Sequence, residues 1–126
     1  MRMKKFINDP RRIVPELLEG LAMAFPDKIA LAREGIVARA QAKSAGLVRI
    51  VTLGGSGHEP GLSGFVGTGM LDLSVAGDIF AAPGASKVID ALRIACAGGA
   101  SALLVVLNHA GDVLSANIAM DAASRE

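Results

Sequence analysis

The chain has 126 residues, of which 52% are hydrophobic and 20% are charged, which suits one folded domain with a packed core. Its formal net charge of +1 gives none of the basic excess that nucleic-acid binding needs. No apolar run approaches the roughly 20 residues that span a bilayer, and no secretory signal is apparent. We therefore expect a single domain over residues 1–126, in the cytoplasm, with neither a membrane nor a nucleic-acid partner.

The first predicted element is a helix over residues 8–25. Asn8 or Asp9 can cap its start, Pro10 suits its first turn, and apolar residues recur at near-helical spacing. Residues 27–45 carry no clear pattern, and both a short helix and irregular structure remain open there.

Three apolar runs follow, and each predicts a strand: LVRIVTL at 47–53, LDLSVAG at 71–77 and ALLVVL at 102–107. The third run is apolar throughout, which is typical of a strand covered on both faces. A helix is predicted between the second and third runs, and another begins near Asp112. Strands that alternate with helices indicate an α/β fold with a largely parallel sheet flanked by helices.

The helix between the second and third strands can be opened by Pro83 and Ser86 and closed by the AGG segment at 97–99. Cys96, the one cysteine, falls in its apolar pattern, so we expect a buried small hydrophobic residue. The final helical pattern has no capping glycine and no strand after it. This favours part of a larger protein or one half of a split one; a small domain closed by oligomerisation is the alternative.

Two glycine-containing segments follow predicted strands: GGSGHEPG at 54–61 and NHAGD at 108–112. In open α/β sheets, ligands bind where loops leave the carboxyl ends of the strands. If these two strands are neighbours, His58 and Asp112 lie near one another. His58 can then exchange hydrogen bonds near neutral pH, and Asp112 can accept a proton from a hydroxyl.

The glycines of the first segment, Gly54, Gly55 and Gly57, allow positive φ angles and a close approach of the backbone to a ligand. Their N–H groups can bind an oxygen-rich ligand. A simpler alternative is that the segment is only a tight connection in which His58 caps backbone groups.

Familiar motifs fail in this segment. A phosphate-binding loop needs Lys followed by Ser or Thr after its second glycine, but His58 and Glu59 follow Gly57. The dinucleotide fingerprint lacks its final glycine. Ser56 is disfavoured as a hydrolase nucleophile because the nucleophile elbow needs glycine at position 58.

A metal site is also disfavoured, because the chain has two histidines and no cysteine pair. His58, His109 and Asp112 are the only trio that we consider for it.

Five segments occur in the order and spacing of the dihydroxyacetone kinase family, in its ketose-binding K subunit: KKFINDP, GGSGHEP, GFVGTGML, AGDIFAAP and NHAGDVL. The resemblance covers essentially all 126 residues. It corresponds only to the N-terminal portion of that two-domain subunit.

The resemblance implies that the chain binds a short-chain ketose such as dihydroxyacetone and positions it for phosphorylation. A separate nucleotide-binding subunit would bring the phosphoryl donor, either ATP with magnesium or a bound ADP rephosphorylated by the sugar phosphotransferase system, so the chain itself would bind no cofactor and no metal. A separate C-terminal half and a homodimer are further implied partners. His58 and Asp112 resemble the catalytic pair, and the implied substrate-binding residues are Gly54, Gly55, Ser56, Gly57, His58, Asn108 and Asp112.

The sequence departs from the family pattern at several positions. Leu53 replaces a glycine, Leu107 replaces a lysine, His109 replaces an aromatic residue, and Ala81 and Ala82 replace residues that are commonly hydroxylated. The histidine that anchors the ketose covalently in the family has no counterpart in the chain. A non-catalytic, ketose-sensing or regulatory paralogue is therefore the alternative function.

Overall fold

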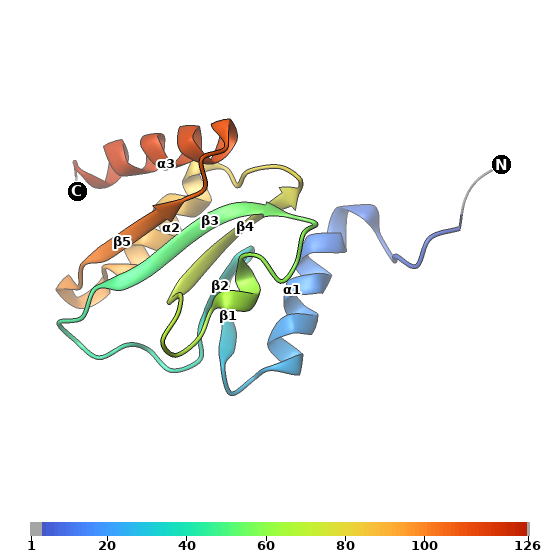
Figure 1. Ribbon diagram of the computed structural model, residues 1–126, viewed down its shortest axis with the longest axis horizontal. Coiled ribbons are helices and arrows are strands. Elements are labelled where there is room, and N and C mark those ends of the chain that lie inside the picture. Colours follow the sequence, from blue (N-terminus) through green and yellow to red (C-terminus); the bar gives the residue numbers. More distant parts are fainter. Residues whose placement is uncertain (1–3, 126) are drawn as a thin grey trace.

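The computed structural model describes residues 4–125 and shows one five-stranded sheet with helices on both faces (Figure 1). Within these residues, no helix combines the length and the apolar content needed to cross a bilayer. The strands are β1 (Ile29–Arg33), β2 (Ile36–Arg39), β3 (Arg49–Ser56), β4 (Leu73–Ile79) and β5 (Ala102–Val106). The helices are α1 (Ile13–Ala24), α2 (Ala85–Ala95) and α3 (Ala110–Ala123), with 3₁₀ turns η1 (Pro10–Arg12), η2 (Ser63–Phe65) and η3 (Ala97–Gly99).

The sheet is mixed, with the spatial order β1-β2-β4-β3-β5. Strand β3 lies at the centre of its parallel part and pairs with both β4 and β5. The remaining pairs, β1 with β2 and β2 with β4, are antiparallel. The predicted α/β fold with flanking helices is therefore confirmed, and its parallel part consists of the three strands that the sequence predicted.

Residues 27–45 form neither of the structures that the sequence left open, because they contain the β1–β2 hairpin. Gly35 turns the chain between the two strands with a φ of 74°, a value that glycine adopts at little cost. Ile36 and Val37 are both buried, because β2 lies inside the sheet and its two faces contribute to different cores. Such consecutive buried residues hide the alternation by which strands are predicted.

The other strands lie close to their predicted positions, with two differences. Strand β3 continues to Ser56, so Gly54 and Gly55 belong to the strand and not to a loop. Strand β5 lies at one edge of the sheet. The expectation that both faces of this strand are covered was wrong, because one face is open to solvent. Leu103 and Val105 keep 55% and 44% of their surface exposed on the open face.

Two hydrophobic clusters hold the layers together, one on each face of the sheet. Helices α2 and α3 pack over one face, and α1 packs over the other with the segment around η2 (Figure 1). The first cluster contains Ile36, Val51, Leu53, Leu73, Val75, Val88, Ala91, Leu92, Ala95, Ala116 and Ala119. The second contains Val14, Leu18, Ile29, Val37, Val66 and Ala76.

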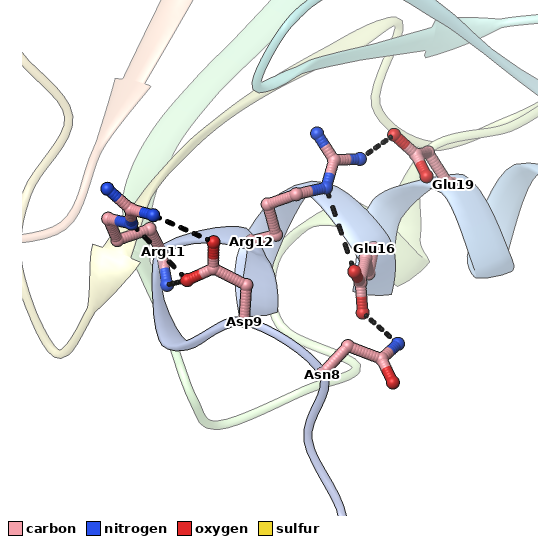
Figure 2. A network of polar contacts seen from close by, with 6 residues as sticks. All are labelled: Asn8, Asp9, Arg11, Arg12, Glu16 and Glu19. Atoms are coloured by element: carbon pink, nitrogen blue, oxygen red, sulfur yellow. Dashed lines mark hydrogen bonds and ion pairs between the residues drawn. The ribbon is translucent and has the colours of Figure 1, made fainter.

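The start of the first helical segment matches its prediction. Asp9 accepts a hydrogen bond from the Arg11 N–H at 2.9 Å, and Pro10 occupies the first turn of η1. Figure 2 shows the polar network around it, in which Arg12 contacts both Glu16 and Glu19 at 3.6 and 2.9 Å. These side chains are solvent-exposed or nearly so, and each such pair contributes about 0–1 kcal/mol.

Helix α2 lies where the sequence predicted, but its ends differ in detail. Gly84 precedes its first turn, in place of the expected Pro83 or Ser86. Cys96 follows its last turn and is exposed, so the expectation of a buried cysteine was wrong. The helical apolar pattern ends one residue earlier, at the buried Ala95.

A buried carboxylate stabilises the amino ends of the parallel strands. Asp72 is 3% exposed and accepts the Ile50 N–H at 2.7 Å, Arg39 Nη1 at 2.9 Å and Lys43 Nζ at 3.1 Å. Burial alone raises the pKa of Asp72, but the hydrogen bonds from Ile50, Arg39 and Lys43 outweigh it and hold this pKa below its ordinary value. Asp72 thereby ties the segment after β2 to strands β3 and β4.

We expect Asp72→Asn to lower the free energy of unfolding at pH 7 by about 2–3 kcal/mol, because two largely buried cations lose their counter-charge. Since the folded pKa is lowered, this stabilisation is present above the pKa of an unfolded Asp, about 3.9, and is lost as the pH falls through the folded pKa. Urea unfolding at several pH values measures it. Asp90→Asn, at a more exposed ion pair, is the control and should change stability by less than about 1 kcal/mol. Equal effects of the two substitutions at pH 7 contradict the prediction.

Candidate functional site

The carboxyl ends of β3, β4 and β5 meet at one edge of the sheet and frame a pocket of about 430 Å³. Three segments build it: the end of β3 with the residues after it, the turn after β4, and the connection from β5 into α3. The lining residues are Gly55, His58, Phe80, Ala81, Ala82, Leu107, His109, Ala110, Gly111 and Asp112. This is the place at which open α/β sheets bind ligands.

Glycines on the strands allow the turn after β4 to fold over the edge of the sheet. A Cβ atom added to Gly55 would lie 2.9 Å from the Ala81 nitrogen, closer than a side chain tolerates. A Cβ atom added to Gly77 would collide with the Ala81 carbonyl oxygen and with the backbone of Ala82 and Pro83. The glycines therefore serve first to admit a segment of the protein itself, which then forms one wall of the pocket.

Asp112 lies in the first turn of α3 with only 5% of its surface exposed. Its Oδ1 atom is buried and has no hydrogen-bond partner. Burial raises the pKa of Asp112, and the nearby His109 and His58 partly oppose this rise. A buried carboxylate without a partner is costly, and a ligand hydroxyl that donates to it removes this cost.

The predicted proximity of His58 and Asp112 is confirmed, since both line the pocket and interact electrostatically. His109 joins them from the position just before α3, where its side chain makes no helix-capping hydrogen bond. Within residues 4–125, no three His, Cys, Asp or Glu side chains are grouped so as to hold a metal ion. The three side chains considered together from the sequence, those of His58, His109 and Asp112, all line the pocket.

Four of the expected substrate-binding residues, Gly54, Ser56, Gly57 and Asn108, are not among the residues that line this pocket. The Ser56 hydroxyl is buried and donates to the Gly77 carbonyl at 2.9 Å. Of the three glycines at 54–57, Gly57 alone has a positive φ, 104°. Its N–H is not free for a ligand, because it donates to both carboxylate oxygens of Glu59 at 3.1 Å.

Phe80 is a lining residue that the sequence did not single out. It has a φ of 53°, which is strained for a bulky side chain and costs on the order of 1–3 kcal/mol. Its N–H donates to the Ser56 carbonyl at 2.7 Å, which helps to hold the turn in this conformation. Gly77, within strand β4, was the available signal for this turn, since glycine within a strand often marks a close approach of another backbone.

The fold and the pocket together define an α/β protein with a small pocket, lined by polar and apolar groups, at the carboxyl ends of its parallel strands. A family model described as the Dak1 domain matches residues 19–126. The chain belongs to the Dak1 domain family.

Individual relatives agree with this assignment. The dihydroxyacetone-binding subunit DhaK of the PTS-dependent dihydroxyacetone kinase of Lactococcus lactis subsp. lactis (strain IL1403) is 37% identical over all of this chain, which spans 38% of that subunit. The dihydroxyacetone kinase of C. freundii superposes with a TM-score of 0.85 and 33% identity, over 97% of this chain and 23% of that one. A dihydroxyacetone kinase operon co-activator, Dha-DhaQ, superposes with a TM-score of 0.80 and 31% identity, over 89% of this chain and 34% of that one.

We expect Asp112→Asn to be more stable than the unsubstituted chain at pH 7. The folded pKa of Asp112 is raised, so its stabilising contribution is full below the unfolded pKa of about 3.9 and is lost as the pH rises through the folded pKa. The amide that Asp112→Asn introduces does not titrate. The difference in the free energy of unfolding between the two proteins should therefore close on acidification. Urea unfolding between pH 3.5 and pH 8 measures the gap. Asp121→Asn, at an exposed position of the same helix, is the control and should change stability by less than about 0.5 kcal/mol at every pH. A stability difference for Asp112→Asn that stays constant with pH contradicts the raised pKa of Asp112.

We expect Gly77→Ala to destabilise the fold by about 1–3 kcal/mol or more. The added methyl group overlaps the backbone at Ala81 and forces the turn after β4 away from the sheet. Thermal unfolding measures the loss. Gly20→Ala is the matched control, since position 20 lies in α1 with no atom near the added methyl group. It should stabilise the chain by about 0.5–1 kcal/mol. A tolerated alanine at 77 rules out the close approach as the reason for glycine there.

Proposed function

We propose that the chain is the ketose-binding component of a dihydroxyacetone kinase. The observation that carries the proposal is the buried carboxylate of Asp112, whose Oδ1 atom has no hydrogen-bond partner and which shares a small pocket with His58 in a Dak1 chain. A short ketose fits this arrangement because it offers a hydroxyl to the carboxylate and further oxygens to the imidazole groups. The relatives' names support the choice of dihydroxyacetone as the ketose to test first.

Asp112 is proposed as the general base. It accepts the proton of the ketose hydroxyl while the hydroxyl oxygen bonds to the γ-phosphorus of the donor and the bond from that phosphorus to the leaving ADP breaks. The raised pKa makes the carboxylate a stronger base than an exposed aspartate. His58 orients the ketose by a hydrogen bond.

The phosphoryl donor is proposed to arrive on a separate nucleotide-binding subunit, as ATP with magnesium or as a bound ADP rephosphorylated by the sugar phosphotransferase system. The side chains that line the pocket include no Lys or Arg to hold phosphate groups. The positive charge that phosphoryl transfer needs therefore comes from the partner in this proposal.

A second partner is proposed for the open side of β5. The chain spans 38% of the Lactococcus subunit, so most of that protein's length has no counterpart within it. The free edge of β5 and its exposed Leu103 and Val105 suit the polypeptide that makes up the rest of the subunit in the longer relatives, whether it follows the chain or is separate from it. A cytoplasmic location and a homodimer complete the proposal; sedimentation of the purified chain measures the latter.

The first test is ligand binding by the isotope-labelled chain, followed by NMR at Gly55, His58 and Asp112. Saturable shifts with dihydroxyacetone but not with glycerol are the expected result. His58→Ala should weaken binding about tenfold or more, because a ligand oxygen loses its partner. Absence of shifts at high ketose concentration counts against the proposal.

The second test is turnover, with the rest of the K subunit and the nucleotide-binding subunit supplied. Asp112→Asn should leave ketose binding within about threefold and lower turnover by about 10²–10⁴-fold. Turnover by the unsubstituted protein should also fall at acidic pH, as protonation of Asp112 removes the base. Ketose binding without any turnover in the reconstituted system favours the sensing or regulatory alternative instead.

A further inference from the structure

We propose that this pocket prefers a ketose with one apolar end, a 1-hydroxy-2-ketone such as hydroxyacetone, over the fully hydroxylated dihydroxyacetone. This inference rests on the proposed function and concerns the substrate class of the same site. It follows from the lining residues, because few of them have a polar side chain that could bind the hydroxyls at both ends of dihydroxyacetone.

The polar side chains of the pocket are limited to three. They are His58, His109 and Asp112, and the two histidines are close enough to act electrostatically on Asp112. Asp112 and His109 lie in and beside the first turn of α3, whose unpaired N–H groups add donors at the same place. The hydroxyl and the carbonyl of a ketose can therefore both be satisfied near this helix end.

The other side chains of the lining are apolar: Phe80, Ala81, Ala82, Leu107 and Ala110. The side chains of Leu107 and Leu62 both cover Gly54. A Cβ atom added to Gly54 would lie 3.4 Å from Leu107 Cδ1 and 3.1 Å from Leu62 Cδ1. The Ala82 methyl group lies against Gly111, 3.0 Å from a Cβ built there. Leucine and alanine side chains thus make up the apolar part of the lining, which is called the wall below.

The backbone N–H groups along this wall offer few hydrogen-bond donors to a second hydroxyl. The N–H of Phe80 donates to the Ser56 carbonyl at 2.7 Å, and that of Ala81 donates to the Asp78 carbonyl at 3.1 Å. The His109 N–H donates to the Leu107 carbonyl at 2.8 Å. These three donors are already used, so a second hydroxyl that contacts the wall gives up part of its hydration and gains no hydrogen bond from them.

The size of the expected preference follows from this loss. An apolar pocket rejects an added hydroxyl by a limited factor, up to about 10². Because the pocket is small and partly open to water, we expect hydroxyacetone to bind about tenfold more tightly than dihydroxyacetone.

The experiment is a pair of NMR titrations of the labelled chain, one with each ketone, followed at Gly55, His58 and Asp112. The same pair is repeated with Leu107→Gln, which adds an amide to the wall, and with Leu103→Gln as the matched control. Leu103 is exposed on β5 and is not a lining residue. Leu107→Gln should reduce the preference to about threefold or less, and Leu103→Gln should leave it unchanged.

The outcomes separate this inference from the proposed function. Dihydroxyacetone binding as tightly as hydroxyacetone overturns the preference and leaves the proposed function intact, whereas no shift with either ketone overturns both. An unchanged preference in a folded Leu107→Gln overturns the role of the wall. If circular dichroism shows that this variant is unfolded, Ala82→Ser makes the same test at another lining position with a smaller change.

Discussion

The pocket depends on one close contact, that of the Ala81 backbone with the two strand glycines Gly55 and Gly77. Without side chains at these positions, the turn after β4 can lie across the edge of the sheet. That turn brings Phe80 and Ala82 to the pocket, and Ala82 in turn packs against Gly111 at the start of α3. Asp112 follows Gly111 in the first turn of α3, so the same packing helps to place its carboxylate at the pocket.

Two buried aspartates at opposite ends of the parallel strands illustrate how the fold separates stability from chemistry. Asp72 lies before β4, and its carboxylate is saturated by a backbone N–H and two cations, which lowers its pKa. Asp112 lies beyond the other end of the strands, lacks a partner at Oδ1 and has a raised pKa. A satisfied charge stabilises structure, while an unsatisfied one at a pocket wall is available for a ligand or a proton.

The sequence predicted the parallel strands, the helices beside them and the meeting of His58 with Asp112, because periodicity and strand-end position carry that information. It missed the β1–β2 hairpin, since the consecutive buried residues Ile36 and Val37 obscure a strand pattern. It also could not tell which groups face the pocket. The Ser56 hydroxyl and the Gly57 N–H are taken by Gly77 and Glu59, contacts that depend on tertiary packing and on the exact path of the loop.

The open side of β5 has a consequence for the behaviour of the chain in solution. A strand with unpaired backbone groups along one edge and branched apolar side chains on one face is a template for any extended segment of similar character. Until it is covered, intermolecular strand pairing competes with correct assembly, and the competition grows with protein concentration. Synthesis of this chain together with whatever covers the edge would therefore protect it from self-association during folding.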